Sequence, residues 1–324
     1  PTYGAVVSRV LAAPEAMPPF VLTPTYLFDM GFPTPSAGGG WLGKSYDPFP
    51  VVRNRMMSAS PKWEGQLPIP DALQLQAGLD TARLQGRQTL LQQMDGRILP
   101  EQSVAQMQTL DRHRQKAMQM VLSPRTRAAF DLSLEPPETH ARYGRFEMGQ
   151  VMLLSRRLIE AGVRFVTANA VSNPVNTALS PFQIWDTHFD HFRLYNDNLL
   201  PEFDQALSAL IEDLEARGRL EETLIIVMGE FGRTPKINNA KDGGRDHWSR
   251  AYSVQMIGGG VRGGVVYGAT DAHAADVTDF PVKPDDLSAT LYELLGIPHD
   301  LVLHDQKGQP HKISEGQPLW NLMT

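Results

Sequence analysis

The segment 185-WDTHFDHF-192 places carboxylates and imidazoles close together along the chain. In an extended backbone, residues two apart point to one face with Cα atoms about 6.6 Å apart, so Asp186 and His188 can converge on one ion. In a helix, the four-residue spacing instead pairs Asp186 with Asp190. Carboxylate oxygen together with imidazole nitrogen suits Zn, Mn or Fe. The structural alternative is that Asp186 caps a following helix and the histidines are solvated.

A second candidate segment, 228-MGEFGRTPKI-237, follows an apolar run that predicts a strand. Ligands of open α/β sheets bind beyond the carboxyl ends of the strands, so Glu230 stands where a functional group is expected. Arg233 can hold an anion through two parallel hydrogen bonds. The alternative is an ordinary turn after a strand, with a surface ion pair.

The third candidate segment is 243-GGRDHWSR-250. His247 is far enough from Glu230 along the chain for a loop to return to the same sheet edge. Asp246 can either ligate a metal or orient His247 from behind. Arg245 adds a second positive group. A Gly-rich turn without function is the alternative, but the recurrence of Asp, Glu and His in the loops of one βα pattern favours a site.

Together these segments predict a divalent-metal site without thiolates, for which Zn or Mn is the expected ion. Its predicted ligands are Asp186, His188, Glu230, Asp246 and His247. The predicted catalytic groups are Arg233 and Arg245, which would stabilise negative charge on a substrate.

Composition excludes several classes of protein. The chain has 324 residues, of which 42% are hydrophobic and 20% charged, close to the globular average. A net charge of −6 provides no basic surface for nucleic acid. The absence of cysteine excludes disulfides, thiolate zinc sites and cysteine nucleophiles. No apolar stretch approaches the roughly 18 to 20 residues of a membrane span, so we expect no span. From the net charge, we expect no nucleic-acid partner.

The three candidate segments lie in a region where predicted helices and strands alternate. Apolar spacing and flanking glycines predict helices over 145–161, 199–217 and 284–295, and strands over 163–169, 224–228 and 253–257. The strand at 224–228 is apolar on both faces, as expected for a parallel sheet covered by helices on both sides. We therefore predict an α/β core at 145–324.

The amino-terminal part has a different character. Residues 1–70 hold 12 of the 25 prolines and predict a Pro-rich layer over the core, with a helix at 4–12 and a strand at 20–23. Residues 71–144 are rich in Gln, Leu, Met and Arg and predict a helical insertion. We treat 1–324 as a single domain.

The remaining histidines have no partner at a metal-binding spacing, and we predict surface or structural roles for them. They are His113, His140, His273, His299, His304 and His311.

At three motifs the chain resembles the bacterial domain-of-unknown-function family 1501. They are Trp185-Asp-Thr-His188, Met228-Gly-Glu-Phe-Gly-Arg-Thr-Pro235 and Gly244-Arg-Asp-His-Trp248. Segments 2–11, 41–49 and 162–169 extend the resemblance over nearly the whole chain. The family is placed in the alkaline phosphatase superfamily, with sulfatases and cofactor-independent phosphoglycerate mutases. The resemblance therefore implies a three-layer α/β sandwich with a mostly parallel central sheet.

The resemblance also implies roles for individual residues. The superfamily uses two metals and a Ser, Thr or formylglycine nucleophile. By position, Asp186 and His188 resemble ligands of one metal and His247 its later histidine, whereas Glu230 stands where an Asp of the second metal is usual. Phe231 departs from the His or Asn that normally follows. A first strand with an Asp ligand, and the nucleophile, have no counterpart after Pro1, so we expect this chain to be an incomplete part of a longer protein.

The implied activity is metal-dependent hydrolysis of a phosphate or sulfate ester. The substrate would be a small molecule or a glycan, and the longer protein would hold up to two metal ions. The alternative is an exported metal-binding or scaffold protein with a non-catalytic site, which Phe231 and the missing nucleophile favour. Similar proteins carry twin-arginine leaders, so we expect a periplasmic or exported location.

Overall fold

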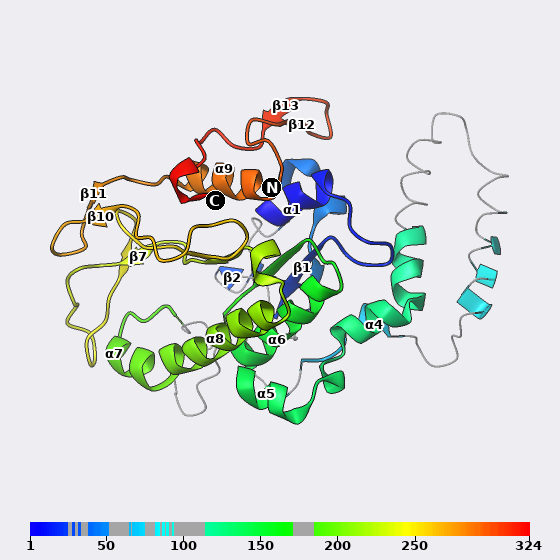
Figure 1. Cartoon of the computed structure of the whole chain (residues 1–324), viewed down its shortest axis with the longest axis horizontal. Coiled ribbons are helices and arrows are strands. Elements are labelled where there is room, and N and C mark those ends of the chain that lie inside the picture. Colours follow the sequence, from blue (N-terminus) through cyan, green and yellow to red (C-terminus); the bar gives the residue numbers. More distant parts are fainter. Residues whose placement is uncertain are drawn as a thin grey trace.

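The computed structural model describes residues 1–24, 28–29, 32–33, 38–51, 65, 67–74, 82–84, 86–87, 89–90, 93, 114–170 and 185–324. The fold is mixed α/β, with helices on both sides of short strands (Figure 1). The helices are α1 (Tyr3–Val10), α4 (Pro124–Phe130), α5 (Pro137–Tyr143), α6 (Glu147–Glu160), α7 (His191–Leu194), α8 (Leu200–Ala216) and α9 (Pro284–Leu294). Among the described residues, no helix has both the length and the apolar character needed to cross a bilayer.

The strands form one parallel sheet and several antiparallel pairs. Those of the parallel sheet are β1 (Phe20–Thr23), β4 (Phe49–Pro50) and β5 (Phe165–Ala168), in the order β4-β1-β5. The pairs are β2 (Phe28–Asp29) with β3 (Phe32–Pro33), β6 (Ile225–Val227) with β9 (Gln255–Ile257), β7 (Gly232–Arg233) with β8 (His247–Trp248), β10 (Ala269–Thr270) with β11 (Val277–Asp279), and β12 (Val302–His304) with β13 (Pro310–Lys312).

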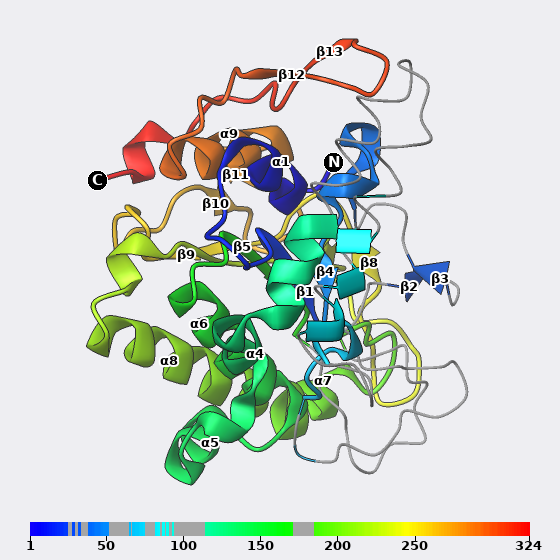
Figure 2. The same cartoon turned by 90° about the vertical axis from the view of Figure 1, so that its right-hand side faces the viewer.

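Alternation along the strands separates two apolar cores. Val166 and Ile225 pack with residues of α6 and α8, whereas their neighbours Phe165 and Ile226 pack with residues of α1 and α9. Successive strand residues point to opposite faces, so each strand contributes to both cores. Figure 1 shows α1 and α9 above the strands and α6 and α8 below them, and Figure 2 gives the orthogonal view.

The elements expected from periodicity are largely confirmed. The helices predicted at 145–161, 199–217 and 284–295 are α6, α8 and α9, and the strands predicted at 20–23 and 163–169 are β1 and β5. Residues 1–70, expected as a covering layer, also supply β1, the middle strand of the parallel sheet. An alkaline phosphatase-like sandwich stays a prediction.

The strand predicted at 224–228 is present as β6, but its expected parallel pairing is wrong. Ile225, Ile226 and Val227 pair antiparallel with Ile257, Met256 and Gln255. An apolar run predicts that a strand is buried on both faces. Helices can cover both faces of a parallel or an antiparallel pair of strands, so the run does not determine the direction of the neighbouring strand.

Part of the predicted helical region at 71–144 lies outside the described residues, including all of 94–113 and therefore His113. Within the described part, residues 114–122, α4 and α5 are helical.

A buried ion network joins α6 to α8 and to the turn before α5. Arg156 of α6 is 2% exposed and lies 2.7 Å from Glu135, 2.7 Å from Glu160 and 3.0 Å from Asp213. The Glu160 contact is an aligned hydrogen bond, and the contacts to Glu135 and Asp213 are ion pairs without that alignment. Tyr143 donates a hydrogen bond of 2.9 Å to Asp213. A buried guanidinium is tolerated here because it faces three carboxylates.

Removal of the central cation should cost more than removal of a surface arginine. Arg156→Ala leaves Glu135 and Asp213 buried without their shared partner, so we expect it to lower the free energy of unfolding by about 3–5 kcal/mol. Arg219→Ala, which breaks the exposed Arg219–Glu222 pair, should cost less than about 1 kcal/mol. Urea unfolding of both variants measures the difference, and equal losses would contradict the network's structural role.

The same network predicts a loss of stability in acid. Burial opposes ionisation of Asp213, but hydrogen bonds from Arg217 and Tyr143 outweigh it and lower the pKa of this carboxyl group. Burial opposes ionisation of Glu135 as well, and its ion pairs with Arg156 and Arg157 lower its pKa. Their contribution is therefore complete above the unfolded pKa values, about 3.9 for Asp and 4.3 for Glu, and is lost as pH falls through the lower folded values.

Unfolding measured across this pH range should show the free energy falling below about pH 4–5. Asp213→Asn should flatten that decline. Asp204→Asn, an exposed aspartate on the same helix, should leave it unchanged. An Asp213→Asn protein with the wild-type acid slope would refute the assignment.

Candidate metal centre

Trp185 anchors the first candidate segment beside the end of the parallel sheet. Its indole N–H donates a 2.5 Å hydrogen bond to the carbonyl of Ala170, two residues beyond β5. The ring also makes edge contacts with Tyr195 and with Phe203 of α8. Trp185 therefore fixes the position of Asp186 near the carboxyl end of β5, where α/β sheets usually bind ligands.

The backbone of 185–190 is neither helix nor strand, and the His188 N–H donates to the Asp186 carbonyl at 3.2 Å in a turn. Asp186 and His188 lie close together as expected, but the expected extended geometry is wrong. Asp190 adopts a left-handed conformation (φ 51°, ψ 31°) at the N-cap position of α7. Its carboxylate pairs with Arg193, one turn later. The Asp190 carboxylate is thus held by Arg193 and is not part of the group that includes Asp186, so the alternative that the two aspartates share an ion is wrong.

The antiparallel pair β7–β8 brings the second and third candidate segments together. Arg233 lies opposite His247 in its register. The same oxygen of Asp186, Oδ1, lies 2.8 Å from a guanidinium nitrogen of Arg233 and 2.7 Å from Nε2 of His247. Residues about sixty positions apart in the sequence therefore meet at one carboxylate.

Three side chains form a group that can hold a metal ion. Nε2 of His188 lies 3.1 Å from Asp186 Oδ1, and one ligand atom each of Asp186, His188 and His247 lies within 4.8 Å of the other two. In a tetrahedral zinc site with bonds of about 2.0–2.1 Å, ligand atoms lie about 3.3 Å apart. Small side-chain movements would therefore admit an ion, and two imidazoles with one carboxylate are a donor set suited to Zn or Mn.

Asp246 lies behind His188 and outside this group. Its Oδ1 is 2.6 Å from Nδ1 of His188, the ring nitrogen that faces away from Asp186. Hydrogen bonds from His188 and then from Asn238 lower the pKa of Asp246, which keeps it an acceptor. Such a carboxylate leaves the other ring nitrogen free for a metal. The expectation that Asp246 orients His247 is corrected, because its side chain contacts His188.

The two predicted catalytic arginines hold the loops together. Besides Asp186, Arg233 donates to the carbonyl groups of Trp185 and Arg245. Arg245 donates to the carbonyl groups of Thr234 and Arg233. Arg233 therefore contacts the metal group through Asp186, whereas Arg245 bonds to the backbone of the neighbouring segment 233–234.

Glu230 is exposed and does not belong to the three-residue group. Its neighbour Phe231 packs on the imidazole of His247, with ring centroids 4.2 Å apart and Arg233 over the Phe231 ring. An aromatic ring thus lies against one side of the metal group.

The other described histidines have surface or structural positions, as expected. His140 is buried and bonds to Gln150 and to the Leu132 carbonyl. His299 bonds to Glu293, and His311 stacks on Trp41. His273 and His304 are exposed.

Two residues near the site were missed in the sequence. His191 is buried, contacts the Thr187 hydroxyl at 2.5 Å and stacks on Tyr195. Burial, and then the positive charges of Arg245 and Arg233, lower its pKa and favour the neutral ring. Asn238 bonds to both the His188 carbonyl and Asp246. The four-residue spacing of Thr187 and His191 is a signal that the sequence contains. No sequence pattern distinguishes Asn238 from any other asparagine in a polar loop.

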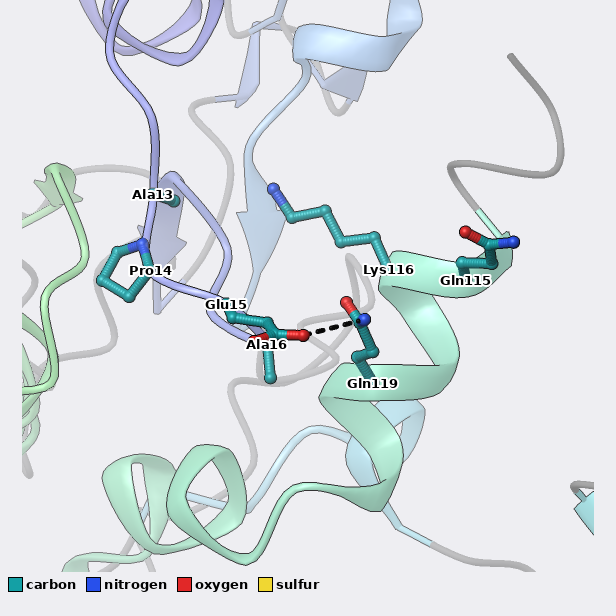
Figure 3. Close-up of a pocket in the computed structure, with 7 residues that line it drawn as sticks. All are labelled: Ala13, Pro14, Glu15, Ala16, Gln115, Lys116 and Gln119. Carbon is teal, nitrogen blue, oxygen red and sulfur yellow. Dashed lines mark hydrogen bonds between the residues drawn. The ribbon is translucent and has the colours of Figure 1, made fainter. Parts of the chain in front are cut away.

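A hollow of about 240 Å³ lies far from these residues, between segment 13–16 and the helix at 114–122 (Figure 3). Its carboxylate, Glu15, accepts a hydrogen bond from Gln119. None of the residues lining it is a histidine, so it lacks the donor set found at Asp186.

Comparison with known families gives one match that spans the chain. The sequence model of a family described as "Protein of unknown function (DUF1501)" matches residues 1–323. No curated protein and no solved structure matches the chain.

Removal of the carboxylate behind His188 should weaken metal binding without unfolding the protein. Asp246→Ala frees the ring of His188, so we expect affinity for Zn²⁺ to fall about 10–100-fold, as for other outer partners of ligand histidines. Asp246 is exposed, so we expect the unfolding midpoint to stay close to that of the wild type. Asp279→Ala, at an exposed aspartate of β11, is the control. Chelator competition measures the affinities, and unchanged binding in Asp246→Ala would refute this role.

Proposed function

The chain belongs to the DUF1501 family, and from that premise we propose that it is a metal-dependent hydrolase of phosphate or sulfate esters. The observation that carries the proposal is the convergence of Asp186, His188 and His247, whose ligand atoms lie within 4.8 Å of one another. Zn or Mn is the proposed ion. The substrate is a small-molecule or glycan ester.

The openness of the metal group supports a catalytic site over a purely structural one. The side chains of His188, Asp186 and His247 are 34%, 40% and 48% exposed. Structural zinc sites are closed by four protein ligands, whereas catalytic zinc sites have three and leave a position for water or substrate. Three partly exposed ligands match the second pattern.

When bound, a divalent ion would polarise an ester oxygen and lower the pKa of a bound water. The residues of the chain prepare the site for that ion. Burial opposes ionisation of Asp186, but hydrogen bonds from His247 and Arg233 outweigh it and lower the pKa of this carboxyl group. Asp186 is therefore an anionic ligand at neutral pH. Asp246 holds His188 with Nε2 toward Asp186.

Arg233 and Arg245 contribute fixed positive charge beside the metal group. Their bonds to backbone carbonyl groups set the position of that charge before a substrate arrives. Charge placed in advance stabilises an anionic substrate without reorganisation during the reaction. We assign them this electrostatic role in the proposed reaction.

We also propose an alkaline phosphatase-like sandwich and a periplasmic or exported location. The parallel sheet β4-β1-β5 and the helices on both sides of the strands support the sandwich. The location rests on the resemblance and on a cysteine-free composition, which is compatible with an oxidising compartment.

A second candidate function is metal binding without catalysis, as in an exported scaffold protein. Two contacts favour it. The guanidinium donors of Arg233 and Arg245 are partly occupied by backbone carbonyl groups, and Phe231 packs on His247. Both contacts reduce the polar surface available to a substrate.

Metal content and ester turnover separate the two functions. We expect Zn²⁺ affinity to fall by about 100-fold or more in His247→Ala, because loss of an outer-shell partner alone costs about 10–100-fold. His304→Ala, an exposed histidine away from the group, should bind as the wild type does. Elemental analysis and chelator competition give these values, and equal metal binding in His247→Ala would refute the centre.

The metal-loaded protein is then assayed on aryl phosphate and aryl sulfate esters. Turnover that Asp186→Ala abolishes supports the hydrolase. Metal binding without turnover would overturn the hydrolase and support the scaffold.

A further inference from the structure

Every polar atom of one loop side chain, Asn238, is used at the proposed metal centre. Its Nδ2 donates to the carbonyl of His188 at 3.0 Å and to Oδ1 of Asp246 at 3.2 Å. Its Oδ1 accepts from the backbone N–H groups of Ala240 and Gly244, each at 3.0 Å. One amide therefore contacts the segment that carries His188, the carboxylate behind His188, and its own loop.

The backbone of the same loop docks onto the segment that carries the first two ligands. Arg245 N–H donates to the Thr187 carbonyl at 3.2 Å. Further on, the N–H groups of Asp190 and His191 donate to the carbonyls of Lys241 and Gly243, each at 3.0 Å. These hydrogen bonds place the backbones of 187–191 and 241–245 side by side, although neither segment forms a regular strand.

Gly244 shows how close this approach is. A Cβ built on Gly244 would lie 1.8 Å from the carbonyl oxygen of His188. No side chain fits there, so the loop can reach His188 only with glycine at this position. The N–H of Gly244 is one of the two groups that Asn238 Oδ1 holds.

We infer that Asn238 is the positioning residue of this centre: its amide fixes His188 through the main-chain carbonyl and through Asp246. This inference rests on the proposed metal centre. Asn238 does not touch the metal group itself. It sets the position of the ligand ring by holding both the backbone of His188 and the carboxylate that receives Nδ1–H.

Only a primary amide of this length supplies two donors and an acceptor at once. Aspartate at 238 keeps the acceptor for Gly244 but loses both donors and sets a second carboxylate against Asp246. Alanine loses all four hydrogen bonds. The chain also offers a matched control, because Asn239 is an exposed asparagine in the same loop.

The first test reads the ring contact in the metal-free protein. Histidine labelled with ¹⁵N reports the Nδ1–H proton of His188, which the signal lost in His188→Ala identifies. We expect this downfield signal in the wild type and in Asn239→Ala, and its loss in Asn238→Ala and Asn238→Asp. Asn238→Asp retains the side-chain oxygen that accepts from the Gly244 N–H. If this variant loses the His188 signal but keeps the wild-type unfolding midpoint, the loss reflects the position of His188 and not unfolding. An unchanged His188 signal in either Asn238 variant would overturn the inference.

The second test measures Zn²⁺ affinity. We expect Asn238→Ala to bind about 10–100-fold more weakly and Asn239→Ala to bind as the wild type does. Because Asn238 acts partly through Asp246, the fold-loss from Asn238→Ala should be smaller in an Asp246→Ala background. Equal losses in both backgrounds would overturn the positioning role. A wild type that shows the Nδ1–H signal but no Zn²⁺ binding would refute the metal centre alone.

Discussion

The candidate site depends on one carboxylate oxygen, Oδ1 of Asp186, which three side chains approach. It lies within 3.1 Å of nitrogen atoms of His188, Arg233 and His247. An anion at this position compensates the arginine and orients both imidazoles, so its ionisation is a condition for the arrangement. The hydrogen bonds that lower the pKa of Asp186 are made by the groups that need the anion. The carboxylate and its neighbours therefore stabilise one another, as expected of charge-assisted hydrogen bonds.

Polar contacts hold the loops of the site together. No residue of 186–190 or 232–247 belongs to the two apolar clusters of the described residues. Guanidinium groups of Arg233 and Arg245 and the amide of Asn238 instead bond to backbone carbonyl groups that have no strand or helix partner. Trp185 is the exception, because its ring packs against Tyr195 and Phe203 while its N–H reaches the end of β5. Through that one side chain the polar loops are attached to the apolar core.

Stability and site formation are concentrated in different parts of the molecule. The ion network around Arg156 lies among α5, α6 and α8, in the core that packs below the strands. The metal group lies where segment 185–190 meets β8, and its ligands remain 34–48% exposed. Buried ion pairs are costly to break, whereas exposed ones contribute little to stability. Substitutions in the candidate site can therefore alter binding while leaving the fold in place.

The sequence by itself determined the local elements, because periodicity and capping act over a few residues. It predicted α6, α8, α9, β1 and β5, and it singled out Asp186, His188 and His247 by residue type and by position in loops. The tertiary structure alone decided which of the candidates meet: it left Glu230 exposed, set Asp246 behind His188 and paired β6 antiparallel with β9. It also gave Asn238 four hydrogen bonds that no sequence pattern predicts. The physical reason is that these contacts join residues up to about sixty positions apart, so their geometry depends on how loops dock after the helices and strands have formed.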